Sequence, residues 1–352
     1  MNVDYLIIGQ GISGTWLSHE LIKANQKVLV IDQQNPLSPS KLAAGLINPI
    51  TGRRHVKTWL ADEIIPSVES YYNELATLLG SSVISKKQIV DFFPSLQMQD
   101  SFVSRIKEDP TLLTLSDEKE KFAANFQFEF GIGLIQEGYT VHLNTLLDKY
   151  REKLLSEKTL FAERFIIDEL KVFESHIEYK NIIAKKIIFC DGNDCINNIY
   201  FNKLPFAPNK GEAVVLRIAQ LDSQFIYKKG MMLIPLAEKD YWWLGSSYAW
   251  TFQDDKPTKE FAESAQKLLS SWIKLNFTIE EHRAAIRPAT LERRPFVGLH
   301  PTHSTVGIFN GMGTKGCSLA PYFAKQFATH LAHGTPIDPE ASIERFKGIL
   351  SR

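Results

Sequence analysis

The sequence predicts an α/β fold (α+β overall) with two lobes, on the basis of three observations. The chain has 352 residues, which is more than one hydrophobic core usually holds. Its N-terminus reads as strand, glycine turn, helix and strand, and a second strand, glycine loop and helix follow near the C-terminus. Between them, runs of aromatic and β-branched residues separated by polar turns predict further strands.

The N-terminal element is predicted to be a dinucleotide-binding, Rossmann-like unit. The apolar strand Val3–Ile8 leads into Gly9-Gln10-Gly11-Ile12-Ser13-Gly14, an amphipathic helix covers Thr15–Asn25, and the strand Lys27–Ile31 ends at Asp32. The first glycine allows the tight turn, the second lets a pyrophosphate approach the backbone, and the third lets the helix pack closely. The N–H groups at the start of the helix then face the phosphates, and the acidic residue suits a ribose hydroxyl.

The middle of the chain predicts a helix, a mixed segment and then alternating strands and helices. Trp59–Leu79 has helical periodicity, and Pro66 either starts a new helix there or kinks this one. Residues 80–140 are charge-rich and typical of a solvated lobe. The elements predicted beyond them are a helix from Leu143 to Leu154, β-like runs at Leu160–Ile167, Lys171–Tyr179 and Ile182–Cys190, strands at Glu212–Ile218, Met231–Leu236 and Tyr241–Ser247, and a helix over Lys259–Ile273.

The C-terminal glycine loop is the second feature that predicts a ligand. The strand Thr305–Phe309 runs into Gly311-Met312-Gly313-Thr314-Lys315-Gly316, and a helix begins near Ser318. A plain turn would also explain the loop. Glycines clustered at a helix N-terminus nevertheless favour the close approach of a ligand to the backbone.

Composition excludes several classes of protein. The formal net charge is zero, which argues against broad electrostatic attraction to nucleic acid or to acidic membranes. Cys190, Cys195 and Cys317 form neither a disulfide framework nor a metal motif, and the pairs His300/His303 and His330/His333 lack the glutamate of a zinc-protease helix. We therefore expect no metal. With no transmembrane stretch and no signal segment, we expect a cytoplasmic protein.

Several segments, taken together and in order, resemble the D-amino-acid-oxidase-like (DAO) family of FAD-dependent amine oxidoreductases, which includes glycine oxidase and monomeric sarcosine oxidase. Besides the N-terminal fingerprint, the matching segments are Ser40–Leu46, Gly138–His142 (the family's turn before its mid-chain helix), Asp191–Gly192, Lys210–Glu212, Arg287–Gly298 and Gly311–Gly316. The chain departs from the family's pattern at two places. Glu292 replaces the family's usual aspartate, and Met231–Ile234 stands where some amino-acid oxidases place a tyrosine.

The resemblance implies an FAD-binding domain assembled from residues 1–55, 138–205 and 280–352, with a mixed-sheet substrate domain formed by residues 56–137 and 206–279. FAD is the implied cofactor. The residues it implies for FAD binding are Gly9, Gly11, Ile12, Ser13, Gly14, Asp32, Gln33, Ser40, Ala43, Ala44, Gly45, Leu46, Ile166, Gly192, Gly311, Gly313, Thr314, Lys315 and Gly316.

The implied reaction is oxidation of the carbon–nitrogen bond of a primary or secondary amine, by hydride transfer to flavin N5. Arg287 is the candidate for holding a substrate carboxylate, because a guanidinium offers bidentate geometry, although a structural ion pair would also explain it. Lys315 would lie near the flavin ring and favour its anionic reduced form, unless it is a solvent-facing loop lysine. Oxygen or another acceptor would take the electrons.

Alternative functions follow from parts of the same evidence. The N-terminal unit alone also suits an NAD-dependent dehydrogenase, and a flavin-binding module without catalysis is a further alternative. The basic run Gly52–Lys57 either is a solvated surface or faces RNA, as in the family's enzyme that trims a side chain on tRNA wobble uridine. The sequence does not fix the amine substrate, the electron acceptor or the oligomeric state.

Overall fold

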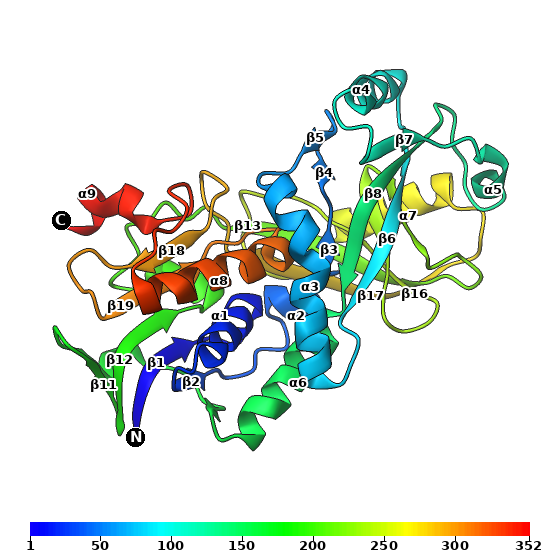
Figure 1. Ribbon diagram of the computed structural model, residues 1–352. Coiled ribbons are helices and arrows are strands. Elements are labelled where there is room, and N and C mark those ends of the chain that lie inside the picture. Colours follow the sequence, from blue (N-terminus) through cyan, green and yellow to red (C-terminus); the bar gives the residue numbers. More distant parts are fainter. The chain divides into compact units, whose positions relative to one another are not determined.

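The computed structural model describes residues 1–352 as two compact units. The first unit comprises residues 1–41, 144–209 and 286–352, and the second comprises residues 42–143 and 210–285. Each unit has its own large sheet, and Figure 1 follows the chain through both. The domain boundaries predicted from the sequence lie after residues 55, 137, 205 and 279, whereas the units divide after Lys41, Leu143, Asn209 and Ala285.

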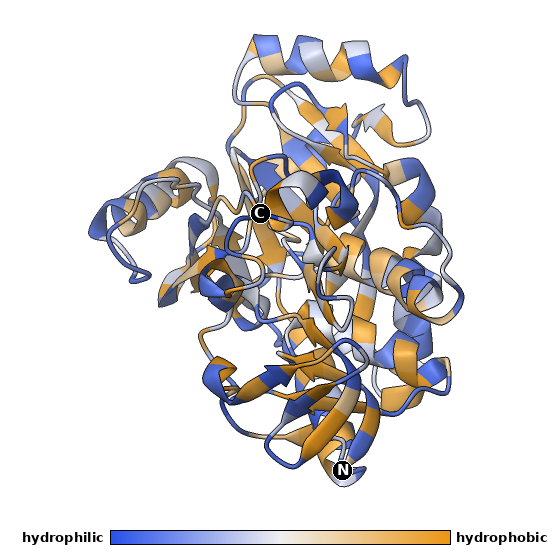
Figure 2. Cartoon of the chain, turned by 90° about the vertical axis from the view of Figure 1, so that its left-hand side faces the viewer, coloured by the Kyte–Doolittle hydropathy of each residue, from blue (hydrophilic) through white to orange (hydrophobic).

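The first unit is built on an eight-stranded sheet with a parallel centre. The parallel strands, in spatial order, are β9 (Leu160–Phe161), β2 (Val28–Ile31), β1 (Asn2–Ile8), β12 (Ile182–Phe189) and β19 (Val306–Asn310). Strands β10 (Leu170–Val172), β11 (Ile177–Tyr179) and β18 (Phe296–Leu299) add antiparallel pairings. The strands near the N-terminus are predominantly hydrophobic in Figure 2, because a parallel sheet covered on both faces buries successive residues.

Helices of the first unit are α1 (Ile12–Lys23), α6 (Leu143–Ser156), α8 (Gly316–His333) and α9 (Lys347–Leu350), with the short α2 (Pro39–Leu42) and the 3₁₀ turns η1 (Ile167–Glu169), η2 (Gly192–Asn197) and η3 (Ile343–Phe346). Helices α1 and α8 lie side by side (Figure 1). Each follows a glycine-containing turn at the carboxyl end of a parallel strand, so both helix N-termini lie at the same edge of the sheet.

The second unit contains a nine-stranded mixed sheet in the order β17-β13-β16-β15-β14-β6-β8-β3, with β7 beside β8. The bounds are β3 (Leu46–Ile47), β6 (Ile84–Phe92), β7 (Leu113–Leu115), β8 (Ile132–Val141), β13 (Asn209–Arg217), β14 (Phe225–Lys229), β15 (Met231–Pro235), β16 (Tyr241–Gly245) and β17 (Thr278–Arg287). A small hairpin, β4 (Ile50–Thr51) and β5 (Val56–Lys57), precedes α3 (Ala61–Leu79), and the other helices are α4 (Leu96–Ile106), α5 (Lys119–Ala123) and α7 (Lys259–Trp272).

The two faces of the second sheet carry separate hydrophobic clusters. On one face Val90 and Phe92 of β6 pack in a cluster with Leu269 and Trp272 of α7. On the other face Ile89 packs in a cluster that includes Phe102 of α4. This alternation follows from the two-residue period of a strand. No helix of the protein is long and apolar enough to cross a membrane.

Most elements predicted from the sequence are present. Helix α1 begins at Ile12 rather than at Thr15, since Gly14 lies inside its first turn. Trp59–Leu79 forms the single helix α3, and Pro66 is accommodated within it. The run Leu160–Ile167 is a strand only in β9, and Lys171–Tyr179 folds as the hairpin of β10 and β11. Strands β14, β17 and β18 have no counterpart among the predicted elements.

The interpretation of residues 80–140 as a solvated lobe is wrong, because β6 and β8 are internal strands of the second sheet. Some of the charged residues lie at the more exposed end of β6, where Lys86 Nζ pairs with Glu137 at 2.6 Å. Gly138–His142 was predicted as a turn before a helix. Instead, residues 138–141 form the last part of β8, and His142 follows the strand. The register shifts near this point, where Glu137 has a φ of +56°, so the deviation is a strand irregularity rather than a turn.

Candidate functional site

The first glycine turn is closely packed in the way that dinucleotide binding requires. Gly9 has a φ of +96°, and a Cβ there would lie 2.7 Å from the carbonyl oxygen of Cys190. A Cβ at Gly14 would lie 1.8 Å from the carbonyl oxygen of Gly9. Larger side chains at these positions would therefore push α1 away from the sheet, and with it the helix N-terminus that faces a phosphate.

The N-terminus of α1 carries no negative charge that would compete with a diphosphate. Its N-cap is Gly11, which has no side-chain cap, and its first turn has no acidic residue. The N–H of Ile12 donates to Ser40 Oγ at 3.1 Å, which places the predicted residue Ser40 directly against the turn. Ser13 is buried at the same helix end. The residues present thus fit an anionic ligand at the positive end of the helix dipole.

Asp32 is held at the end of β2 by a network that the sequence analysis missed. Its Oδ2 accepts from Gln10 N at 2.9 Å, and its Oδ1 accepts from Arg151 Nη1 at 2.7 Å. Arg151 Nη2 also donates to the Asp32 carbonyl oxygen at 3.0 Å. Each carboxylate oxygen accepts more than one hydrogen bond, so Oδ2 can still accept from a ribose hydroxyl. Gln33, predicted beside it, is exposed.

The C-terminal glycine loop lies in the same unit and reaches the start of α1. Gly311 has a φ of +78°, and a Cβ there would lie 2.6 Å from Thr290 Cγ2. A Cβ at Gly316 would lie 3.0 Å from Ile12 Cγ2. Gly313 also has a positive φ, and Thr314 is exposed. The structure therefore brings together two glycine loops that lie about 300 residues apart in the chain, at one edge of one sheet.

Asn310 connects the two strands that end at this edge, and it too was missed. Its Nδ2 donates to the carbonyl oxygen of Gly192 at 2.9 Å and to Asp191 Oδ1 at 3.3 Å. Its Oδ1 accepts from Gly311 N at 2.8 Å. The predicted residue Gly192 is thus tied to the C-terminal loop. Burial raises the pKa of the neighbouring Asp191 carboxyl to about 7.

Arg287 lies on a segment that is bonded to the C-terminal loop. The N–H of Gly313 donates to the carbonyl oxygen of Pro288 at 3.2 Å, directly after Arg287. The guanidinium donates through Nη1 to Asn209 Oδ1 at 2.6 Å. This anchoring from neighbouring elements fixes the position of the one arginine that the sequence analysis singled out as a carboxylate ligand.

Lys315 is the N-cap residue of α8 and is partly buried. Burial lowers its pKa, and the positive charges of Arg294 and Arg293 lower it further. The next residue in the loop, Gly316, is the glycine that lies close to Ile12 of α1. The structure thus places this cationic side chain in the loop predicted to face the cofactor.

The remaining predicted cofactor residues have contacts of their own within each unit. Ala43, Ala44, Gly45 and Leu46 belong to the second unit, where Leu46 pairs with Thr140 across β3 and β8. A Cβ at Gly45 would lie 1.9 Å from the carbonyl oxygen of Val141, so this glycine has a packing reason of its own. Ile166 belongs to the first unit, and its N–H donates to the Tyr179 hydroxyl at 3.1 Å.

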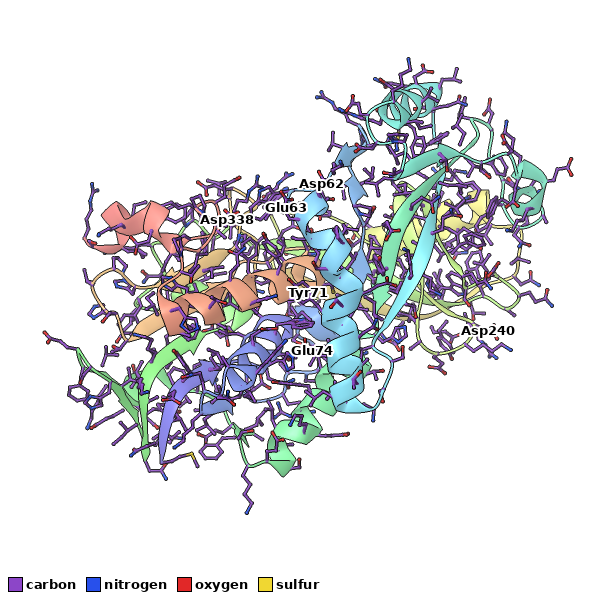
Figure 3. All side chains as sticks on the ribbon, in the orientation of Figure 1. Asp62, Glu63, Tyr71, Glu74, Asp240 and Asp338 are labelled. Atoms are coloured by element: carbon purple, nitrogen blue, oxygen red, sulfur yellow. The ribbon has the colours of Figure 1, made fainter.

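The basic run Gly52–Lys57 does not form a continuous cationic surface. Arg53 and Arg54 are exposed at the tip of the β4–β5 hairpin. Lys57 Nζ pairs with Asp109 at 2.5 Å and with Asp62 at 3.0 Å, and Figure 3 labels Asp62 at the start of α3. His55 is buried.

His55 instead belongs to a buried charged cluster of the second unit. Its Nε2 lies 3.0 Å from Asp91 Oδ2, which also accepts from Lys228 Nζ at 2.6 Å. Asp91 and Lys228 face each other across β6 and β14. Elsewhere, no group of three or more His, Cys, Asp or Glu side chains is arranged to hold a metal ion.

Comparison with known proteins agrees with this arrangement. The sequence model of the DAO family, described as FAD dependent oxidoreductase, matches residues 4–330. Among solved structures, glycine oxidase from Geobacillus kaustophilus has a TM-score of 0.78 at 15% identity, covering 96% of each chain.

Two further solved structures are similar over nearly their whole length. Iminodiacetate oxidase from Chelativorans sp. BNC1 has a TM-score of 0.78 at 18% identity and covers 97% of this chain and 98% of its own. L-proline dehydrogenase from P. horikoshii has a TM-score of 0.76 at 14% identity and covers 99% of this chain and 98% of its own. At these identities the structural likeness establishes a shared fold.

Proposed function

The chain belongs to the DAO family of FAD-dependent oxidoreductases, and on this premise we propose that it oxidises the carbon–nitrogen bond of a small amine that carries a carboxylate. The observation that supports the substrate class most directly is Arg287, whose following residue is hydrogen-bonded to the C-terminal glycine loop. Three of the solved structures with this fold are those of glycine oxidase, iminodiacetate oxidase and L-proline dehydrogenase. The compound in each of these names is an amine that carries a carboxylate.

The residues of the first unit fit FAD. The tight contacts at Gly9 and Gly14 support a diphosphate at the α1 N-terminus, and the hydrogen bond from Arg151 to Asp32 supports Asp32 as the acceptor for a ribose hydroxyl. The loop Gly311–Gly316 reaches α1 at Gly316, where a Cβ would lie 3.0 Å from Ile12 Cγ2. We assign FAD binding to the first unit and propose the second as the substrate domain.

Bound FAD supplies the chemistry by accepting a hydride at N5. The neutral amine would lose a hydride, that is two electrons and one proton, and become a protonated imine, which water hydrolyses to a carbonyl compound and an amine or ammonium ion. Arg287 orients the substrate by holding its carboxylate. Lys315 and the N-terminus of α8 stabilise negative charge in the loop beside the cofactor. We propose oxygen as the electron acceptor, with hydrogen peroxide as product.

An anaerobic screen of amines and amino acids tests the proposal, with loss of the flavin absorption band as the readout. We expect amino acids or N-substituted amino acids to bleach the band, and Arg287→Ala to lower the rate of bleaching at subsaturating substrate at least about a hundredfold. Arg283→Ala is the matched control, because Arg283 lies on the same strand and pairs with Glu281. Equal bleaching by Arg287→Ala and wild type would show that the arginine does not hold the carboxylate.

The alternative functions give different results in the same preparation. A colourless protein that binds NAD tightly would support the dehydrogenase, and a retained flavin that no amine reduces would support a module without catalysis. For the tRNA-modifying alternative, Arg53 and Arg54 are the exposed basic residues of the run, since His55 is buried and Lys57 is paired with Asp62 and Asp109. Salt-sensitive tRNA binding that is lost when both are neutralised would favour it.

A further inference from the structure

Two asparagines of the first unit donate or accept hydrogen bonds at Arg287 and at the residue before it. Asn209, at the start of β13, accepts the Arg287 guanidinium on Oδ1 at 2.6 Å. Asn193, in η2 directly after Gly192, donates through Nδ2 to the carbonyl oxygen of Ile286. On the other side of the arginine, the carbonyl oxygen of Pro288 accepts from Gly313 N at 3.2 Å. The residues on both sides of Arg287 are therefore bonded to elements of the predicted cofactor site.

Each asparagine leaves one buried polar atom without a partner. These atoms are Asn193 Oδ1 and Asn209 Nδ2. Their identities follow from the hydrogen bonds just described, because only an amide NH₂ donates to Ile286 and only an amide oxygen accepts from Arg287. An unpaired buried acceptor or donor costs about 1–3 kcal/mol, so two of them next to one functional arginine indicate a ligand that satisfies both.

The two unpaired atoms match the two ends of a 2-amino acid. The Asn209 Nδ2 donor lies next to the guanidinium, and both donors suit a carboxylate. The Asn193 Oδ1 acceptor belongs to a side chain anchored one residue from Arg287 along the chain, and an acceptor suits the N–H of an amine. The two anchoring residues, Ile286 and Arg287, are neighbours in the chain, which suits a ligand whose nitrogen and carboxylate are close together.

We propose that Asn209 Nδ2 and Asn193 Oδ1 are specificity-determining contacts of the substrate site, the first for the carboxylate and the second for the amine nitrogen. This deepens the function proposed above and rests on it. What it adds is the assignment of the two ends of such a substrate to named side chains. Asn209 has a second role as a positioning residue, because it also holds the guanidinium.

A matched pair of ligands tests the Asn193 contact. Pyrrole-2-carboxylate and furan-2-carboxylate have the same shape, but the first has a ring N–H next to the carboxylate where the second has an oxygen. Their dissociation constants are measured on the flavin-loaded protein from the change in flavin absorbance. We expect wild type to bind pyrrole-2-carboxylate about tenfold more tightly, and Asn193→Ala to abolish this preference by weakening that ligand alone.

Two substitutions separate the roles of Asn209. Asn209→Ala is expected to weaken both ligands by the same factor, about tenfold. Asn209→Asp keeps an oxygen for Arg287 but replaces the donor with an anionic acceptor. We therefore expect the affinity for both ring carboxylates to fall by more than in Asn209→Ala. If Asn209→Asp binds them like wild type, then Asn209 only positions the arginine, and the proposed carboxylate contact is wrong.

The control is Asn198→Ala, which removes another buried asparagine of the same unit whose side chain accepts from Tyr200 N at 2.9 Å. Flavin content and thermal unfolding show whether each variant is folded and loaded. Asn193→Ala could instead lower the flavin content and leave the ratio of the two dissociation constants unchanged. Asn193 Oδ1 would then contact the cofactor, and the inference would be overturned.

The outcomes also distinguish this inference from the function on which it rests. If amino acids bleach the wild-type flavin and Arg287→Ala prevents it, while Asn193→Ala keeps the preference for the pyrrole, only the inference fails. If no amino acid bleaches the wild-type flavin and neither ring carboxylate binds, both proposals fail together.

Discussion

Removal of the Asp91 carboxylate is expected to destabilise the second unit severely. Asp91 has no exposed surface and accepts from Lys228, which is itself only 9% exposed. In Asp91→Ala, the Lys228 ammonium and His55 would lose the group that both contact. Breaking a buried ion pair by removing one partner costs about 3–5 kcal/mol, because the other charge is left in a poorly solvated place.

Thermal unfolding followed by circular dichroism measures this effect. At about 2–4 °C per kcal/mol for a unit of this size, the unfolding midpoint of Asp91→Ala should fall by about 6–20 °C. Asp100→Ala removes an exposed aspartate of α4 in the same unit and should shift the midpoint by no more than about 2 °C.

A triple variant tests the physical reason for the loss. Asp91→Leu with Lys228→Met and His55→Phe replaces the cluster with apolar side chains, and such replacements are often neutral or stabilising. We expect it to recover most of the lost midpoint. The reasoning is refuted if Asp91→Ala unfolds at the wild-type temperature, or if the triple variant is no more stable than Asp91→Ala.

Three further predictions concern the first unit. Gly14→Ala places a methyl group 1.8 Å from the Gly9 carbonyl oxygen and should yield protein with little flavin, whereas Gly348→Ala, with open space around it, should retain a wild-type flavin-to-protein ratio. Arg151→Leu removes two hydrogen bonds that hold Asp32 and should raise the FAD dissociation constant about ten- to a hundredfold in a fluorescence titration; an unchanged constant would contradict the role given to Asp32. Burial raises the pKa of Asp191 to about 7, so between about pH 4 and 7 the unfolded chain binds fewer protons than the folded one, and wild-type stability falls as the pH rises through this window. The side chain of Asp191→Asn does not titrate. The unfolding midpoint of Asp191→Asn minus that of wild type should therefore increase from about pH 5 to about pH 8, and a difference that is the same at both pH values would count against the shifted pKa.

The parts of the site that could be predicted from the sequence are those with a local signature. Gly9, Gly14 and Asp32 follow from one strand–turn–helix–strand segment, because the spacing of glycine and acidic residues is set by neighbouring elements. The C-terminal glycine loop was recognised in the same way. That the two loops meet depends on strands paired across the whole chain, and the family resemblance, not the spacing, predicted it.

The residues that were missed depend on long-range packing. Asn193, Asn209 and Asn310 belong to three different elements, η2, β13 and β19, and their contacts form only in the fold. Arg151 did have a signal, since it lies on the same helical face as Leu147 and Leu154 and is a charge within an apolar stripe. A charged residue in such a position needs a buried partner, which here is Asp32.

The three-segment construction of the first unit has a consequence for synthesis. Strand β1 is made first, its neighbour β12 only after most of the second unit, and β19 near the end. At about 5–20 residues per second, roughly 15–60 s separate the first glycine turn from the loop that faces it. Until then the ribosome-bound chain has only half of its cofactor site. Both glycine loops can contact flavin only in a chain that has been synthesised as far as α8. Flavin that stays bound during purification therefore indicates chains that include this helix.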